Sequence, residues 1–435
     1  MLFRQFVNED LGCASYLVGD AAFGEAVVVD PAFAIEQYLS AAAAEGVRIV
    51  GVLETHTHAD HVSGHGRFAT EQSVAVSIHP IAAPEYPFDP IEDGQIVRVG
   101  SVEVRVVHTP GHRPEHCAFV ADSELVLTGD SLFVGEAARP DLAVEAKQGA
   151  SDLFRSLRRL AELPDSVVVY PGHVSGSLCG TNMSDERLTS IGREKETNIV
   201  FREDERSFVD SSASITTPRP PTTERVIALN RGPWVAARPP LEPVEPCEAV
   251  VLDVRPVKDY TAGHVPGAIS VALGGGSFAT RSAFVLDPAE LIVVHARYPA
   301  EAQEAARRLW SVGLFETGGY LAGAAATEQT ETVTVAEFAR LLGDSGVQVL
   351  DVREERERVE GVVPGAIHVP YRLAGTASLE ELDPSAPVYA ICASGARATL
   401  AASLLASRGY DARPVVDGGV EDLAELNARL VANLP

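Results

Sequence analysis

The sequence lacks several features that would place it in a specialised class of protein. No apolar run approaches the roughly 18 residues of a membrane span, so no spanning helix is expected. The five cysteines are odd in number, scattered and without a Cys-x-x-Cys pair, which favours reduced thiols over a disulfide framework. The first ten residues are charged and contain no apolar segment, so we expect no signal peptide. These absences together predict a cytoplasmic protein.

Positive charge is also scarce. Thirty-five Lys and Arg residues stand against 61 Asp and Glu residues, which gives a formal net charge of −26. Nucleic acids and anionic membranes bind basic surfaces, so neither is expected as a partner. Hydrophobic residues make up 46% of the chain and charged residues 22%, as in an ordinary globular protein. At 435 residues the chain is too long for one core, so two or three domains are expected.

The first part of the sequence alternates strand-like and helix-like runs. The strand-like runs are Val27–Asp30, Ile49–Glu54, Val102–His108 and Val167–Tyr170, and the helix-like runs are Ile35–Glu45 and Ser151–Glu162. This mixture predicts a layered α/β fold. From Ser184 to about Pro240 the chain becomes polar and then proline-rich, which indicates a helical extension followed by a linker. We therefore place the first domain at residues 1–240.

An internal repeat follows the linker. Val251-Leu-Asp-Val-Arg255 returns as Val349-Leu-Asp-Val-Arg353, and Gly263–Ile269 returns as Gly361–Ile367 at the same spacing. A Gly-Gly pair closes each unit, at 318–319 and at 418–419. The repeat predicts two small α/β domains, at residues 241–330 and 331–435. Two copies indicate a tandem duplication rather than a solenoid.

Histidines and aspartates gather at predicted strand ends in the first domain. The strand Ile49–Leu53 runs into His56-Thr57-His58-Ala59-Asp60-His61, and three further candidates end later strands: His112, Asp130 and His173. Repeated placement of such side chains at strand ends, with glycine beside three of them, predicts a metal site. Three other histidines fit no ligand pattern and are expected to be ordinary hydrogen-bonded residues: His65, His79 and His116. A fourth, His108, lies inside a predicted strand and is expected to be structural.

This set of residues resembles the ligand set of the metallo-β-lactamase superfamily, and the resemblance covers about residues 1–240. It implies an αββα fold with two metal positions. The first metal would be held by His56, His58 and His112. The second would be held by Asp60, His61 and His173, with Asp130 bridging the two. Such a site permits a dinuclear zinc hydrolase of the glyoxalase II or lactonase type, in which zinc-bound hydroxide is the nucleophile.

The persulfide dioxygenase branch of this superfamily implies a different metal. Its single ferrous iron is held by residues that match His56, His112 and Asp130. Two imidazoles and one carboxylate form a facial triad that leaves positions open for substrate sulfur and dioxygen. The remaining side chains would then orient the ligands through hydrogen bonds: His58, Asp60, His61 and His173. The ligand count alone does not decide between one Fe(II) per chain and two Zn.

A cysteine loop stands near the end of the sequence. The strand Val388–Ile391 leads into Cys392-Ala-Ser-Gly-Ala-Arg397 and the helical run Ala398–Ser407. Converging backbone N–H groups and a positive helix end stabilise a thiolate or a bound persulfide there, and Arg397 adds a fixed positive charge. The unit resembles a rhodanese domain over about 331–435, which implies that Cys392 accepts sulfur as a persulfide and passes it on. The C-x4-R spacing is also close to a phosphatase signature, so phosphate chemistry stays a minor alternative.

The middle unit has the same framework without the thiol. Ala296, or His295 after a one-residue slip, falls opposite Cys392, and Glu301 falls opposite Arg397. We therefore predict a degenerate rhodanese domain with a scaffolding or docking role.

Other candidates lie beside the predicted metal site. Cys179, flanked by glycines shortly after His173, is expected to contact or accept the sulfur substrate. Arg139 is expected either to bind an anionic part of the substrate or to form a salt bridge with a neighbouring carboxylate. Cys13 and Cys117 sit in apolar runs and are expected in the core.

The complete chain resembles bacterial fusions of a persulfide dioxygenase, a degenerate rhodanese and an active rhodanese used in sulfide detoxification. The expected reactants are a low-molecular-weight thiol persulfide, dioxygen and sulfite, and the expected products are sulfite and thiosulfate. The alternative is a dinuclear zinc thioesterase of glyoxalase II type with attached rhodanese domains. A purely partner-binding protein is disfavoured because both sites are intact. The thiol carrier, the order of reactions and a homo-oligomeric state remain open.

Overall fold

The computed structural model describes residues 1–141, 144–174, 184–214, 218–245, 248–323, 327–342 and 346–426. The chain divides into two compact units, the first formed by Met1–Arg238 with Trp310–Gly313 and the second by Pro239–Leu309 with Leu314–Pro435. Among the described residues, no helix combines the length and the apolar character needed to cross a membrane.

Two six-stranded sheets form the centre of the first unit. In the first sheet the strands follow the order β1-β2-β3-β4-β5-β6: Leu2–Asn8, Cys13–Asp20, Glu25–Val29, Arg48–Leu53, Ala75–Ile78 and Asp89–Pro90. In the second sheet the order is β12-β11-β10-β9-β8-β7: Thr189–Ser190, Val168–Pro171, Leu125–Gly129, Cys117–Ala121, Val102–His108 and Ile96–Val99. Both sheets combine antiparallel neighbours with parallel ones, such as β3 with β4 in the first sheet and β10 with β11 in the second.

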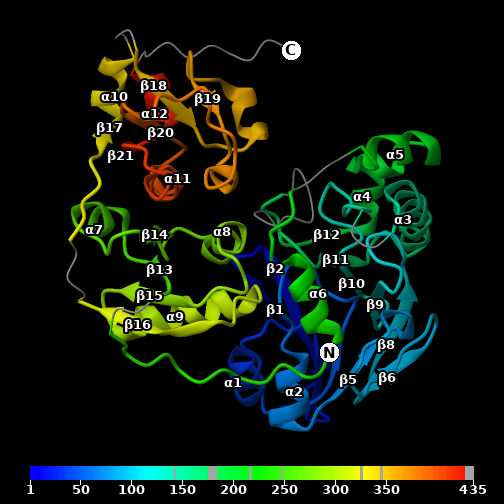
Figure 1. Cartoon of the computed structure of the whole chain (residues 1–435). Helices are drawn as coiled ribbons and strands as arrows, with labels where there is room; N and C mark the ends of the chain where they lie inside the picture. Colours follow the sequence, from blue (N-terminus) through cyan, green and yellow to red (C-terminus); the bar gives the residue numbers. More distant parts are fainter. Residues whose placement is uncertain are drawn as a thin grey trace. The chain divides into compact units, whose positions relative to one another are not determined.

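Helices cover the outer faces of both sheets (Figure 1). They are α1 Glu36–Glu45, α2 His65–Gln72, α3 Ala146–Leu160, α4 Ile191–Thr197 and α5 Glu205–Ser212, with short 3-10 turns at Pro80–Ala82 and Ile199–Phe201. A sixth helix, α6 Thr223–Arg231, contacts the loop after β4. Tyr38 of α1 packs in a cluster with the first sheet, and Leu153 of α3 packs in a cluster with the second. A third cluster, which includes Tyr16 and Phe119, lies between the sheets. The expected αββα fold is confirmed.

The second unit contains two mostly parallel sheets. In the first sheet the strands follow the order β14-β13-β15-β16: Ile269–Ser270, Val250–Asp253, Ile292–Ala296 and Thr317–Ala322. Its helices are α7 Val257–Ala262, α8 Phe278–Val285 and α9 Pro299–Ser311. The second has the order β17-β21-β20-β18-β19: Val333–Thr334, Ala412–Val416, Val388–Ile391, Gln348–Asp351 and Ile367–His368. Its helices are α10 Val335–Leu341, α11 Ala396–Ala406 and α12 Val420–Glu425, with 3-10 turns at Glu355–Glu360 and Tyr371–Leu373.

Strand register aligns the two repeats residue by residue. Asp253 pairs with His295 in the first sheet, and Asp351 pairs with Ile391 in the second. The next residues are Ala296 and Cys392, so the alignment without a slip is the one that the register supports. The Gly-Gly pairs, in contrast, are not equivalent as we had expected. Gly319 lies inside β16 and pairs with β15, whereas the pair at 418–419 follows the end of β21.

Candidate metal centre and thiol loop

Three of the predicted ligands form a compact buried cluster at the ends of strands. His56 follows β4 of the first sheet, while His112 and Asp130 follow β8 and β10 of the second. The Nε2 atoms of His112 and His56 lie 3.4 and 3.9 Å from Asp130 Oδ2. One donor atom of each residue lies within 4.8 Å of the others. Both sheets therefore deliver donors to one point.

The donor atoms in this cluster have the lone pairs that a cation needs. Within the described part of the chain, Nε2 of His56 and Nε2 of His112 are buried without a hydrogen-bond partner. Nδ1 of His112 lies 2.9 Å from the carbonyl oxygen of Arg139, which can only accept, so Nδ1 carries the proton. Nε2 is then free to bind a metal, the usual arrangement of a histidine ligand. Because unpaired buried polar atoms are costly, these residues fit a divalent cation.

Protonation states in the cluster also suit a metal. Burial, and then the imidazoles of His58 and His112, lower the pKa of His56 well below its ordinary value. Burial lowers the pKa of His112 as well. Burial raises the pKa of Asp130, but His173 and His112 lower it by more, so the carboxyl is ionised. Neutral imidazoles beside an ionised carboxylate are the forms in which these groups bind metals.

The other four predicted residues lie directly beside this cluster. His173 Nε2 is 3.2 Å from Asp130 Oδ1 and 3.5 Å from Asp60 Oδ2, and His61 Nδ1 is 3.3 Å from Asp60 Oδ1. Nδ1 of His58 is 4.0 Å from Asp60 Oδ1. All seven side chains from four separate segments of the sequence thus converge.

Two buried carboxylates that the sequence analysis missed hold His58. Its Nε2 lies 3.1 Å from Glu54 Oε2 and 3.2 Å from Asp30 Oδ1. Glu54 also accepts hydrogen bonds from Ser63 and His65. These acceptors orient the His58 ring so that Nδ1 is turned towards the other ligands. Only the position of Glu54 just before the histidine run offered a hint in the sequence.

The two predicted substrate contacts have different outcomes. The guanidinium of Arg139 forms two hydrogen bonds with Asp141, at 2.7 and 2.8 Å, which is the salt bridge of the two alternatives. Its carbonyl oxygen has the further role of holding His112. Contact with a substrate anion stays a prediction. Cys179 lies outside the described residues.

His116 supports Asp130 through the backbone, a role the sequence analysis did not assign. Its Nε2 accepts the N–H of Asp130 at 2.9 Å, and its Nδ1 lies 2.8 Å from Thr109 Oγ1. Gly129 has a φ of +48°, and a Cβ there would lie 2.7 Å from His116 Nε2. Glycine therefore lets the chain turn tightly against His116 just before the ligand.

Asn230 on α6 fastens the histidine loop from far along the chain. Its Nδ2 donates to the carbonyl oxygens of His58 and His61 at 3.0 and 2.8 Å, and its Oδ1 accepts the N–H of Ser63 at 2.9 Å. Asn230 is buried. The sequence offered no signal for this role, because the residue lies in the segment expected to be extension and linker.

The cysteines at 13 and 117 differ. Cys117 lies in the core between the sheets, as expected. Cys13 is buried too, but its Sγ is 3.0 Å from Asp60 Oδ2, beside the candidate ligands.

In the second unit, Cys392 occupies the turn from β20 to α11. The N–H of Gly395 donates to its Sγ at 3.1 Å, and Gly395 has a φ of +88°, a conformation that favours glycine. A Cβ at Gly419 would lie 2.0 Å from the carbonyl oxygen of Ala393, so this glycine allows β21 and α12 to close over the loop. The sulfur is thus buried and faces a backbone donor.

Arg397 does not stand alone beside this thiol. Its guanidinium forms two hydrogen bonds with Glu357, at 2.5 and 2.6 Å. Burial raises the pKa of Glu357, but Arg397 lowers it by more, so the carboxylate is ionised. The positive charge that we expected near Cys392 is therefore largely compensated.

The equivalent loop of the middle repeat is filled by its own side chains. Glu301 accepts the backbone N–H of Arg297 at 2.8 Å and pairs with its guanidinium at 2.8 Å. The sequence contains no cysteine between Cys247 and Cys392. The middle repeat thus has alanine at the position of the thiol, and the carboxylate of Glu301, at the position of Arg397, accepts a backbone N–H of the loop.

Asn230→Ala should loosen the metal loop. The change leaves two carbonyl groups and one N–H without their partner, so we expect a loss of about 1–3 kcal/mol in the free energy of unfolding. Metal affinity should fall roughly 10–100-fold, as for other residues that orient ligands. Chemical denaturation and competition with a chelator measure both. Glu224→Ala, on the exposed face of the same helix, is the control, and equal behaviour of the two variants would contradict this role.

Acid should destabilise the metal-free protein partly through His116. Burial, and then His112, lower the pKa of His116 from 6.5 to about 3. Between these pH values the unfolded chain binds a proton that the folded chain does not. The contribution of neutral His116 to the free energy of unfolding is therefore complete above pH 6.5 and declines as the pH falls towards 3. The non-titrating variant His116→Gln should show a shallower dependence of unfolding free energy on pH; parallel curves would refute this assignment.

Comparisons with known proteins agree with this architecture. The family model of the Metallo-beta-lactamase superfamily matches residues 8–173, and that of the Rhodanese-like domain matches residues 241–325 and 334–426. The chain is 30% identical over 195 residues to Persulfide dioxygenase ETHE1, mitochondrial, of Bos taurus, which covers 43% of this chain and 74% of that protein. It is 36% identical over 167 residues to a Hydroxyacylglutathione hydrolase of Cereibacter sphaeroides, which covers 37% of this chain and 61% of that protein.

One solved structure extends the similarity beyond the first unit. A metallo-beta-lactamase from Staphylococcus aureus superposes with a TM-score of 0.69 at 27% identity, covering 74% of this chain and 98% of that one. Relatives with a dioxygenase name and with a hydrolase name match the same first part of the chain at similar identity. The comparisons therefore establish the family without the specific reaction. The chain belongs to the metallo-beta-lactamase superfamily and carries rhodanese-like domains after its metal-binding domain.

Proposed function

We propose that this chain is a non-heme Fe(II) persulfide dioxygenase coupled to a rhodanese sulfurtransferase. It would oxidise the terminal sulfur of a low-molecular-weight thiol persulfide to sulfite and pass a second sulfur to sulfite to give thiosulfate. The observation that carries the proposal is the presence of two sites on one chain: a buried set of two imidazoles and one carboxylate, and a thiol loop with a backbone donor at the sulfur.

The overall reactions balance. A thiol persulfide, one dioxygen and one water give the thiol, sulfite and two protons. The four electrons lost by the sulfane sulfur are those that reduce dioxygen. In the second reaction Cys392 takes the outer sulfur of another thiol persulfide and releases the thiol, and the resulting Cys392 persulfide and sulfite then give free Cys392 and thiosulfate. The bond between the two sulfur atoms of the persulfide breaks, and a bond between the outer sulfur and the sulfite sulfur forms.

The metal would be held by His56, His112 and Asp130. When bound, ferrous iron supplies open coordination positions for substrate sulfur and dioxygen. The protein supplies neutral imidazoles, an ionised carboxylate and fixed ring orientations, the last through the Arg139 carbonyl at His112. Burial of all three residues keeps bulk water away from the donors.

The rhodanese loop would carry sulfur as a persulfide on Cys392. The N–H of Gly395 faces Sγ at 3.1 Å and can stabilise negative charge on the sulfur as the outer sulfur leaves. The start of α11 adds the positive end of a helix. Arg397, paired with Glu357, would position the loop rather than supply free charge.

A dinuclear zinc thioesterase is the second candidate. The observation in its favour is Nδ1 of His58, which is buried without a hydrogen-bond partner in the described part of the chain, close to Asp60. With it, each metal position of a hydrolase has three donors besides the bridging Asp130. The similarity to a hydroxyacylglutathione hydrolase supports the same interpretation.

Metal content and oxygen uptake separate the two candidates. Purified full-length protein should contain about one iron per chain and consume dioxygen when a glutathione or coenzyme A persulfide is added. His112→Ala should abolish both, because it removes one of three ligands, whereas His108→Ala should keep both. Two zinc ions per chain, no oxygen uptake and hydrolysis of a glutathione thioester would establish the hydrolase instead.

Cys392→Ser should separate the two reactions. The variant keeps the loop but removes the nucleophilic sulfur, so thiosulfate formation from sulfite should fall to background. Oxygen uptake with the same persulfide should stay within about twofold of the wild type. Cys117→Ser, which removes a core thiol, controls for general loss of a cysteine. Equal loss of both activities in Cys392→Ser would contradict separate sites.

A further inference from the structure

We propose that Cys13, Asp60 and His61 form a cation site of their own, suited to a thiophilic divalent ion such as Zn²⁺, beside the cluster of His56, His112 and Asp130. This site goes beyond the proposed function and does not require it. It also differs from the hydrolase arrangement, in which His173 completes the second metal position and Cys13 has no part.

The backbone carries Cys13 to the metal centre. Cys13 is the first residue of β2 and forms an isolated bridge with His173. Ala14 donates to the carbonyl oxygen of Gly172 at 2.7 Å, and Val174 donates to that of Gly12 at 2.8 Å. The thiol is therefore fixed beside the candidate ligands by main-chain hydrogen bonds on both sides of it.

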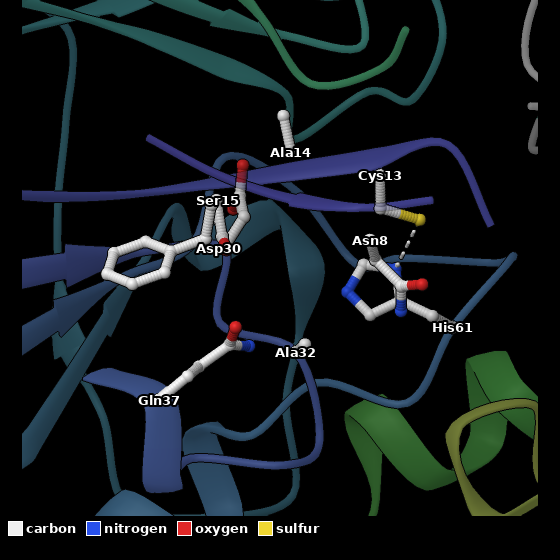
Figure 2. A pocket seen from close by; sticks show the side chains of 9 residues that line it. Asn8, Cys13, Ala14, Ser15, Asp30, Ala32, Gln37 and His61 are labelled. Atoms are coloured by element: carbon white, nitrogen blue, oxygen red, sulfur yellow. Dashed lines mark hydrogen bonds between the residues drawn. The ribbon is translucent and has the colours of Figure 1, made fainter. Parts of the chain in front are cut away.

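The side chain then turns towards two donors of different chemistry. Sγ of Cys13 lies 3.0 Å from Asp60 Oδ2 and 3.7 Å from His61 Nδ1. Figure 2 shows the sulfur pointing at the His61 ring. One donor atom from each of the three residues lies within 4.8 Å of the other two. Cys13 and His61 are buried and Asp60 is partly buried.

A second, independent feature borders the same carboxylate. Nδ1 of His58 is buried and has no hydrogen-bond partner among the described residues, and it lies 4.0 Å from Asp60 Oδ1. The centroids of the His58 and His61 rings are 4.3 Å apart. A small cavity of about 10 Å³, lined by Cys13 and His61 among others, lies alongside (Figure 2). That volume is close to the space of one water molecule, the ligand that commonly completes a zinc site.

The donor set selects the ion. Thiolate, imidazole and carboxylate together favour zinc, and the sulfur distinguishes this site from the nitrogen and oxygen donors of the neighbouring cluster. On binding, the thiol gives up its proton to solvent as the bond between zinc and sulfur forms. The thiolate and the Asp60 carboxylate then balance the two positive charges.

Cobalt reports directly on a thiolate ligand. Metal-free full-length protein titrated with Co²⁺ should develop a near-ultraviolet sulfur-to-cobalt charge-transfer band that saturates with one thiolate-bound cobalt per chain. Cys13→Ser should abolish the band, and Asp60→Asn should weaken cobalt binding at this site at least about tenfold. Cys392→Ser, the matched control at the thiol of the rhodanese loop, should leave the band intact. Added Zn²⁺ should bleach it in the wild type.

The outcomes separate this site from the proposed function. His112→Ala should keep the band while it loses iron, so a failed dioxygenase assay leaves the inference standing. No band in the wild type, a band that persists in Cys13→Ser, or one that disappears in Cys392→Ser would overturn it. If Cys13→Ser fails to fold by circular dichroism, Cys13→Ala and Asp60→Asn take its place, and an unchanged band in both would equally overturn the inference.

Discussion

Removing the carboxylate of Asp130 from water leaves a charge that its surroundings must compensate. The compensation comes from the imidazoles of His112 and His173, which outweigh the effect of burial on its pKa. Burial keeps the imidazoles of His56 and His112 neutral, and their Nε2 lone pairs lie inside the cluster without a hydrogen-bond partner among the described residues. A buried anion beside unpaired nitrogen lone pairs is the environment that a divalent cation satisfies. The fit for a metal is therefore a property of the folded protein, whichever metal it is.

Holding the cluster of His56, His112 and Asp130 together requires groups outside it. The carbonyl oxygen of Arg139 fixes one ring, Glu54 and Asp30 fix another, and His116 holds the backbone of the carboxylate ligand. Each of these contacts satisfies a donor or acceptor that would otherwise be buried unpaired. The thiol loop shows the same principle on a smaller scale, because Glu357 compensates the charge of Arg397, which is partly buried beside the cysteine.

The sequence allowed the fold and the seven converging side chains of the metal cluster to be predicted, because ligands at strand ends follow local patterns. The strand Val102–His108 has the bounds that its β-branched residues indicated. What could not be predicted depends on pairing across the fold. Asn230 and Asp30 are ordinary polar residues in isolation, and only the folded chain shows which groups they satisfy. Cys13 was assigned to the core because an apolar run reveals burial but not which side chains face it across the interior.

The contacts of Asn230 also bear on where the metal-binding domain ends. All seven candidate ligands are in place by residue 173, where the match to the superfamily model stops. Asn230, the residue of α6 that donates to the carbonyl oxygen of His61, comes 169 residues after it. A fragment that ended at residue 173 would contain every candidate donor atom but would lack Asn230, whose hydrogen bonds hold the histidine loop. A fragment that keeps the hydrogen bonds of Asn230 to the histidine loop must therefore include α6.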